Sequence, residues 1–288
     1  MQKLFSYLRL ARFHKPVGIF LLLWPTLIAL WIAGQGHPKP WLVGIFILGV
    51  VVMRSAGCVI NDLVDKEFDQ HVERTKKRPL VMNEITVKGA FIFFCLLSFI
   101  AFLLALTLNT LSLKIACIAM LLTLIYPFMK RYTYWPQFVL GAAFGIAILM
   151  AFTASINVVP LEAFILYAAM LVWAIIYDTE YAMFDRIDDQ KIGLKSTAIL
   201  FAQHDKLIIG LLQILFLMLL SFLGIFLEYS KFYFLSLIGI SLFFIYQQWL
   251  IKDREREACF KAFLNNQWLG AFWFLSTVFQ YGCFQTFF

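Results

Sequence analysis

The chain has 288 residues, of which 62% are hydrophobic and only 14% are charged. Soluble domains average about 25% charged residues, so this composition excludes an ordinary soluble protein and indicates an integral membrane protein. The net charge of +7 does not indicate nucleic-acid binding, because no basic stripe with interleaved aromatic residues lies outside the apolar segments.

Apolar runs of about 20 residues recur along the chain, and a helix of that length crosses the hydrocarbon core of a bilayer. Backbone polar groups in lipid must be satisfied within the segment, so we predict an all-α, polytopic bundle. No linker or low-complexity segment divides residues 1–288, so a single integral-membrane domain is expected. The nine predicted spans lie near 17–34, 41–60, 88–108, 112–128, 135–156, 161–178, 207–227, 232–251 and 268–288.

Basic residues are distributed unevenly between the two sides of these spans. With the N-terminus inside, the outer loops hold only Lys39, Lys114 and Lys231 of the 24 lysines and arginines. This asymmetry follows the positive-inside rule and predicts a cytoplasmic N-terminus. The outer connections are short, whereas two inner acidic loops, about 61–87 and 179–206, are long. We expect these loops to form a cap on the cytoplasmic side.

Three polar residues, Arg12, His14 and Lys15, precede the first span. Lone cations at this depth usually anchor to lipid headgroups, which is the simpler interpretation. A general-base role for His14 is the alternative.

The first acidic cluster begins where the second span ends. Asp62, Asp65 and Asp69 are three and four residues apart, so on a helix they share one face, with Asn61 beside them. Arg54 lies two turns earlier on the Asn61 face, within an otherwise apolar span. An arginine at that depth is costly, so it either neutralises the acids or binds an anionic co-substrate such as an aromatic carboxylate.

A second acidic cluster follows the sixth span. Asp185 and Asp189 repeat the four-residue spacing of the first cluster, Asp178 lies on the same face, and Tyr181 and Asp188 flank them. Four spans separate the clusters, and an even number returns the chain to the same side of the membrane. Both clusters therefore face one compartment and can converge.

Oxygen ligands at these spacings predict a magnesium site. Mg²⁺ prefers one or two carboxylates, water and substrate phosphate oxygens to a closed protein cage. Two opposed carboxylate stripes would hold Mg²⁺ against a diphosphate, whereas the plainer alternative is two helix ends with solvated acids balanced by cations. The candidate ligands are Asn61, Asp62, Asp65, Asp69, Asp185 and Asp189.

Basic side chains gather at the same boundary. Arginine suits bidentate contact with phosphate, and lysine supplies a point charge. The positive-inside rule alone would also place cations here, so both interpretations stay open. The candidates are Arg74 to Arg78 as a group, Lys130, Arg131, Lys191 and Lys195.

Five segments carry a resemblance to the UbiA-type membrane prenyltransferases, and within them to the bacterial branch that prenylates 4-hydroxybenzoate in ubiquinone biosynthesis. They are HKPVGIFLLLWPT (14–26), MRSAGCVINDLVDKEFD (53–69), RTKKRPL (74–80), YPFMKR (126–131) and YDTEYAMFDRIDDQKIGLKSTA (177–198), and DREREACFKAF (253–263) is similar to a segment of that branch. The resemblance covers nearly the whole chain. It implies nine helices around a central cavity capped by inner loops, Mg²⁺, a polyprenyl diphosphate donor and a 4-hydroxybenzoate acceptor in the inner membrane, with no obligate protein partner.

The resemblance also implies roles for individual residues. The residues expected to be catalytic are Asp65, Asp69, Asp185, Asp189 and Arg131, of which Arg131 matches the arginine that contacts diphosphate. The residues expected to bind substrate are Asn61, Arg54, Lys130, Lys195, Lys191, Tyr181 and Asp178.

Two other functions stay open. A prenyltransferase for another acceptor would use the same metal chemistry with a different acceptor pocket. A transporter with a carboxylate ion site is the second alternative, but such sites usually lie near the bilayer midplane, and here both acidic clusters lie at one boundary.

Overall fold

The computed structural model describes residues 2–70 and 75–284, and these are almost entirely helical with no strand among them. The long helices are α2 (Val17–Ala33), α3 (Pro40–Asp69), α4 (Val87–Leu106), α5 (Thr110–Tyr132), α6 (Pro136–Ile156), α7 (Leu161–Lys191), α9 (Asp205–Phe226), α10 (Lys231–Ile251) and α11 (Arg256–Phe284). The short elements are α1 (Gln2–Leu10), α8 (Thr197–Phe201) and the 3₁₀ helix η1 (Ala202–His204). The prediction of an all-α bundle is confirmed.

The nine predicted spans each coincide with a long helix, but the count of nine membrane crossings is met only in part. Within the described ranges, seven helical segments are long and apolar enough to cross a membrane. Helix α2 is apolar but has 17 residues, and α11 is not among the seven. The chain is therefore a multi-pass membrane protein. Its first and last long helices, α2 and α11, are not among the helices that meet the length and hydropathy of a membrane span.

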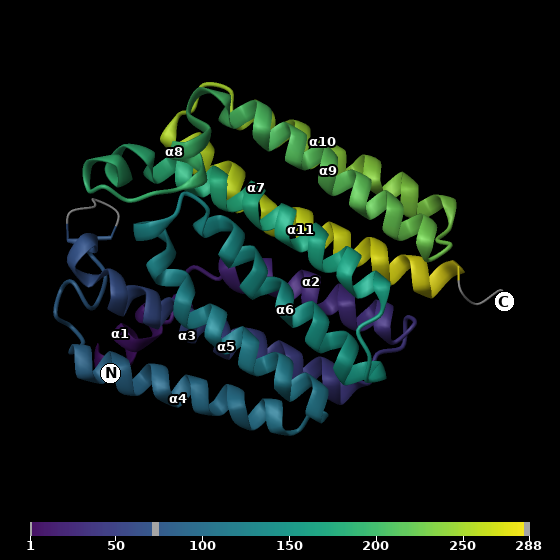
Figure 1. The fold of residues 1–288 in the computed structure, drawn as a ribbon, viewed down its shortest axis with the longest axis horizontal. Coiled ribbons are helices and arrows are strands. Elements are labelled where there is room, and N and C mark those ends of the chain that lie inside the picture. Colours follow the sequence, from purple (N-terminus) through teal and green to yellow (C-terminus); the bar gives the residue numbers. More distant parts are fainter. Residues whose placement is uncertain (1, 71–74, 285–288) are drawn as a thin grey trace.

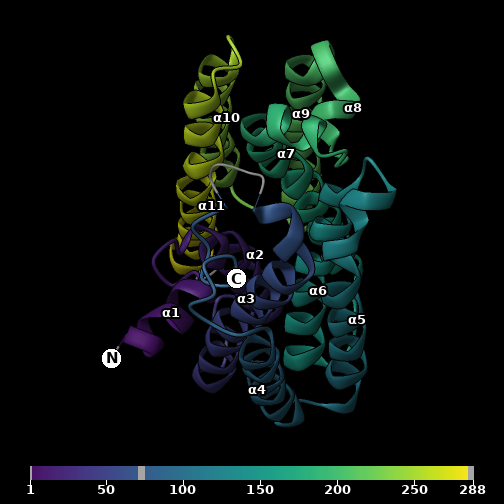
Figure 2. The ribbon, with the colours of Figure 1, turned by 90° about the vertical axis from the view of Figure 1, so that its left-hand side faces the viewer.

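The long helices run side by side (Figure 1). Helices α9 and α10 lie on one side of the bundle and α4 lies on the opposite side, in both views (Figures 1 and 2). The short helices α1 and α8 lie toward the same end (Figure 1). That end holds the elements that do not span the membrane.

The acidic segments are helical, which corrects the prediction of two acidic loops. Helices α3 and α7 continue past residues 60 and 178 and end only at Asp69 and Lys191. No glycine or proline interrupts either helix near its acidic end, and Gly193, with φ +72°, follows the second one. Each acidic cluster is thus held on a rigid helix, as the four-residue spacing predicted.

Small residues bring α6 against α7. A Cβ on Gly141 would lie 2.9 Å from the Cβ of Ala174, and one on Gly145 would lie 2.7 Å from the Tyr167 ring. Real side chains do not approach so closely, so only glycine permits this packing. The Gly141–Gly145 stretch is therefore a helix-packing face.

A buried polar network joins α7 to α11. Trp173 Nε1 donates a hydrogen bond to Asn266 Oδ1, and Asn266 Nδ2 donates to Glu180 Oε2, each at 2.8 Å. All three side chains are fully buried. Because α7 carries the second acidic cluster, this network fixes the rotation of that helix.

Replacing Asn266 with alanine should destabilise the bundle by about 2–4 kcal/mol, because it leaves the Trp173 N–H and the Glu180 carboxyl without their partner in the protein interior. The measurement is the unfolding midpoint of purified protein in detergent. Lys261→Ala, on an exposed position of the same helix, is the control and should shift stability by less than about 0.5 kcal/mol. An Asn266→Ala protein as stable as wild type would contradict this role.

Candidate active site

A polar cavity of about 460 Å³ lies among the ends of α2, α3, α5, α6, α7 and α11. Both acidic clusters line it, so the two stripes share one cavity, as the even number of intervening spans predicted. We call it the polar chamber. The predicted site residues that line it are Arg54, Asn61, Asp62, Asp65, Asp69, Lys130, Asp178, Tyr181, Asp185, Asp189 and Lys195.

Two arginines reach the first stripe: Arg78, from the predicted Arg74 to Arg78 group, and Arg12, for which the sequence favoured a headgroup anchor. Asp62 accepts a hydrogen bond from Arg12 Nη2 at 2.8 Å and pairs with Arg78 Nη1 at 3.0 Å. Arg78 also pairs with Asp69. Arg12 has φ 58°, an unusual conformation for a residue other than glycine, in the turn between α1 and α2. Through this turn the Arg12 side chain reaches Asp62 in the chamber, whereas a simple headgroup anchor would face the lipid.

Asp65 is the most constrained carboxylate of the first stripe. It is only 1% exposed, pairs with Lys130, and accepts a hydrogen bond from Asn61 Nδ2 at 3.0 Å on its Oδ2. Its Oδ1 is buried and has no hydrogen-bond partner among the described residues. An unpaired carboxylate oxygen is costly in the protein interior, so this atom is available to a ligand.

The second stripe lines the chamber from α7. Asp185 and Asp189 face the cavity, whereas Asp188 pairs instead with Arg256 Nη2 at 2.7 Å. Tyr181 also lines the chamber, and its ring centroid lies 4.8 Å from that of Phe263 on α11. The packing of α7 on α11 therefore orients the second stripe.

Arg131 and Lys191 do not line the chamber. Arg131 Nη2 donates to the Val64 carbonyl at 2.6 Å, and its guanidinium lies 4.9 Å from the centroid of the Phe68 ring. Lys191 is exposed. Of the two neighbours on α5, Lys130 lines the cavity in this structure, and the roles of Arg131 and Lys191 at the diphosphate stay predictions.

The remaining cations occupy the rim. Lys195 lines the chamber, and its Nζ donates to the Tyr132 carbonyl at 3.2 Å. Of the predicted Arg74 to Arg78 group, Arg74 lies outside the described residues, and Lys77 and Arg78 line the chamber.

His14 lines the chamber from the segment before α2. Burial, followed by the charges of Lys15, Arg9 and Arg12, lowers the pKa of His14 below its usual value. The imidazole is therefore neutral at neutral pH.

Arg54 lies where the polar chamber meets a second cavity. Its Nη1 lies 2.7 Å from Cys58 Sγ, its guanidinium is 5.9 Å from the Phe144 ring centroid, and its buried Nε has no partner in the described part of the chain. A Cβ on Gly18 would overlap the guanidinium, at 2.7 Å from Cζ. Glycine at this position thus makes the space that Arg54 occupies.

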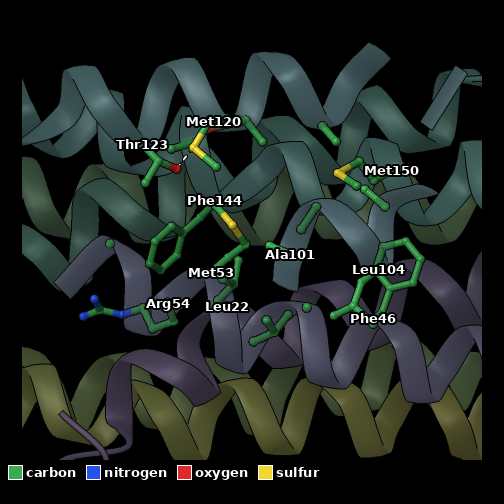
Figure 3. Close-up of a pocket in the computed structure, with 18 of the residues that line it drawn as sticks. Leu22, Phe46, Met53, Arg54, Ala101, Leu104, Met120, Thr123, Phe144 and Met150 are labelled. Atoms are coloured by element: carbon green, nitrogen blue, oxygen red, sulfur yellow. Dashed lines mark hydrogen bonds between the residues drawn. The ribbon is translucent and has the colours of Figure 1, made fainter. Parts of the chain in front are cut away.

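The second cavity, which we call the apolar cavity, has a volume of about 450 Å³. Its walls come from α3, α4, α5 and α6, with Leu22 from α2. Figure 3 shows Arg54 at one end, and Phe46, Leu104 and Met150 at the other. The two cavities adjoin, because both are lined by Arg54, Gly57, Tyr126, Leu140 and Phe144.

The carboxylate oxygens that line the polar chamber fit a divalent ion that is bound both by the protein and by a phosphate group of a ligand. Within the described ranges, no three histidine, cysteine, aspartate or glutamate side chains are placed to enclose a metal ion by themselves. Mg²⁺ commonly takes one or two carboxylates and completes its shell with water and substrate phosphates. Asp65 Oδ1, which has no partner among the residues that the structure describes, lies in a chamber lined by aspartates from two helices and matches that mode.

A multi-pass helical bundle in which a chamber of acids and cations adjoins an apolar cavity defines a membrane enzyme for amphiphilic substrates with an anionic head and an apolar tail. The chain belongs to the UbiA prenyltransferase family, whose sequence pattern matches residues 22–276. Two relatives carry the name 4-hydroxybenzoate octaprenyltransferase. The protein of Aliivibrio fischeri (strain MJ11) is 53% identical over 96% of both chains. That of Methylococcus capsulatus is 54% identical over 92% of this chain and 91% of its own.

Solved structures of the family have the same fold. A UbiA homologue from Aeropyrum pernix K1 superposes with a TM-score of 0.77 at 22% identity, covering 88% of this chain and 95% of its own. A homologue from Archaeoglobus fulgidus, bound to GPP and Mg²⁺, superposes with a TM-score of 0.72 at 18% identity, covering 94% and 99%. The membrane-bundle architecture is therefore that of the family.

Proposed function

We propose that this chain transfers a polyprenyl group from polyprenyl diphosphate to the ring carbon of 4-hydroxybenzoate ortho to its hydroxyl, with release of diphosphate, in ubiquinone biosynthesis. The observation that carries the proposal is the convergence of two aspartate stripes in one chamber that adjoins an apolar cavity. The names of relatives more than 50% identical to this chain support the same acceptor and donor class.

The aspartates would hold the metal and the cations would hold the diphosphate. Mg²⁺, when bound, neutralises the diphosphate and makes it a better leaving group. The ligands we propose for it are Asn61, Asp62, Asp65, Asp69, Asp185 and Asp189. In the free chamber Asp65 pairs with Lys130, and Arg78 pairs with Asp62 and Asp69. Because a metal–diphosphate complex brings charges of both signs, these cations can turn to phosphate oxygens without leaving any aspartate unpaired.

The cations would also stabilise charge during the reaction. As the bond between the prenyl carbon and its oxygen breaks, negative charge grows on the diphosphate, and Lys130, Arg12 and Arg78 lie around the chamber that would hold it. The allylic carbon becomes positively charged. The apolar lining beyond Arg54 excludes water that would quench it.

Arg54 is the residue we propose for the carboxylate of the acceptor. It is positioned at the junction between the chamber and the apolar cavity, and its Nε has no protein partner in the described residues. A carboxylate held there would place the aromatic ring beside the junction. The ring carbon ortho to the hydroxyl is activated by electron donation from the hydroxyl oxygen, and it attacks the allylic carbon as the bond to the diphosphate breaks. The proton on that ring carbon is then lost to the released diphosphate or to water, which restores the aromatic ring.

The polar chamber would face the cytoplasm and the protein would reside in the inner membrane. The charge asymmetry of the loops supports this orientation, since the outer loops hold only Lys39, Lys114 and Lys231 of the 24 basic residues.

Pyrophosphate release tests the function directly. Purified protein should release pyrophosphate from a prenyl diphosphate only when both Mg²⁺ and 4-hydroxybenzoate are present, and chelation by EDTA should stop the release reversibly. A panel with one donor and several aromatic acceptors, including a naphthoate and homogentisate, identifies the acceptor. Ion or substrate flux in proteoliposomes without pyrophosphate release would favour a transporter and overturn the proposal.

A further inference from the structure

A buried ion-pair cluster lies outside the polar chamber, where the acidic end of α7 meets α9 and the turn between α10 and α11. Its centre is Asp205, the first residue of α9, whose side chain is fully buried. Arg254, in the turn, approaches Asp205 Oδ1 with Nη2 at 2.8 Å and with Nε at 3.0 Å. Arg186 of α7 donates to Asp205 Oδ2 through its Nη2. One carboxylate thus binds an arginine from α7 and an arginine from the turn.

A second ion pair holds the same end of α7 to α11. Asp188 Oδ2 accepts a hydrogen bond from Arg256 Nη2 at 2.7 Å, and the Arg256 guanidinium lies 4.9 Å from the centroid of the Phe184 ring. Arg256 is the first residue of α11. The acidic end of α7 is therefore attached to α9 by one pair and to α11 by another.

The two pairs flank the second aspartate stripe, Asp185 and Asp189. Successive residues of a helix are rotated by about 100°, which places Arg186 about 80° to one side of this stripe and Asp188 about 80° to the other. The stripe lines the polar chamber, whereas Arg186 and Asp188 do not. A helix that is held on both sides of a stripe cannot rotate about its axis without breaking one of the pairs. The pairs thus keep the stripe directed into the chamber.

We propose that Arg186, through its pair with Asp205, is a positioning residue for the divalent ion, because it holds α7 at the rotation in which the second stripe faces the chamber. The inference rests on the proposed function and adds the residues that shape the metal site from outside it. Replacing a side chain that orients a metal ligand lowers metal affinity by about 10–100-fold. The first stripe is supported differently, since its aspartates pair directly with Arg12, Arg78 and Lys130.

The sign of the effect separates positioning from electrostatics. Arg186 follows Asp185 directly in the sequence, and its positive charge repels a divalent cation bound nearby. If Arg186 acted through its charge alone, replacing it with the neutral methionine would favour Mg²⁺ binding. Because Arg186 instead holds the helix, the same replacement should weaken Mg²⁺ binding.

The test measures Mg²⁺ binding without turnover, in the full-length protein in detergent. Geranyl diphosphate is present without an acceptor, and the rise of the unfolding midpoint with Mg²⁺ gives the concentration at half effect. Arg186→Met should raise that concentration by about tenfold or more. Arg254→Met is the matched control, because it removes an arginine from the same carboxylate and leaves the pair between α7 and α9 in place. It should keep the wild-type concentration. The Mg²⁺ concentration for half-maximal product formation is measured on the same preparations and should change in the same way.

Each result separates the positioning role from the function. A half-effect concentration in Arg186→Met that is equal to or lower than that of wild type overturns the positioning role, and so does the same rise in Arg254→Met, while the enzyme remains a prenyltransferase. Wild-type protein that shows neither Mg²⁺-dependent protection nor product formation overturns the proposed function and the positioning role with it. If Arg186→Met fails to fold, Arg186→Lys decides, because lysine keeps the charge and loses the forked geometry of the guanidinium. A raised half-effect concentration in that variant supports the positioning role, and an unchanged one overturns it.

Discussion

Replacing Asp65 with asparagine should lower kcat/KM by about 10²–10³-fold while the protein remains folded. Asp65 is buried, and its Oδ1 has no hydrogen-bond partner in the described residues. Asparagine keeps the shape of the side chain but loses the charge that a divalent ion requires. The measurement is the rate of formation of the prenylated product at increasing Mg²⁺, with the unfolding midpoint recorded for the same preparations.

The control for this prediction is Glu67→Gln, because Glu67 is an exposed acid two residues away on the same helix and does not line the chamber. Its activity should stay within about twofold of wild type. A structural role for Asp65 is tested by the double variant Asp65→Asn/Lys130→Gln, which removes both partners of the ion pair. If Asp65 only neutralises Lys130, Asp65→Asn should lower the unfolding midpoint, the double variant should restore it, and the Mg²⁺ concentration needed for half-maximal activity of Asp65→Asn should equal that of wild type. That result would contradict a metal-binding role.

The location of the acidic stripes could be predicted because it depends on local geometry. Residues four apart share a helix face, and an even number of spans returns the chain to the same side. These two facts brought Asp65 and Asp185 to one chamber in the prediction and in the structure. They do not require knowledge of how any two helices pack.

The cations of the site could not be predicted in the same way. Lys130 and Arg131 are neighbours, and one residue rotates a helix position by about 100°, so only one of the two can face the chamber. Which one does so depends on the rotation of α5, and that is set by packing against α3 and α6. The pairing of Arg12 with Asp62, 50 positions apart, depends on the turn before α2 and leaves no local signal in the sequence.

The apolar cavity could not be predicted from the sequence for a different reason. Helices α3 to α6 are apolar on nearly every face, so hydrophobic periodicity does not distinguish a side chain that faces lipid from one that faces a cavity. The apolar cavity and its position beside Arg54 therefore required the structure.

Substituting Arg54 should impair use of the acceptor more than use of the donor. A charge-assisted hydrogen bond contributes about 1.5–3 kcal/mol, so Arg54→Gln should reduce kcat/KM for 4-hydroxybenzoate by about 10–100-fold. Gly18→Ala should act through the same residue, because the added Cβ overlaps the Arg54 guanidinium. The atoms that clash are at the end of a flexible side chain, so the guanidinium moves and the helices stay packed. The expected result is a higher KM for 4-hydroxybenzoate with little change in the unfolding midpoint.

An acceptor without a negative charge separates the two roles that Arg54 can have. If Arg54 binds the carboxylate, wild type and Arg54→Gln should prenylate 4-hydroxybenzamide at similar rates, because the missing charge removes the interaction from both. If Arg54 instead neutralises the nearby aspartates, Arg54→Gln should lose the same factor with either acceptor, and the KM for the prenyl diphosphate should change as well. Arg54 lines both cavities, so either role is sterically open to it. Its Nε has no partner in the described part of the chain, and this, together with the space that Gly18 leaves for the guanidinium, favours an anionic ligand. Equal losses with the two acceptors would overturn that assignment.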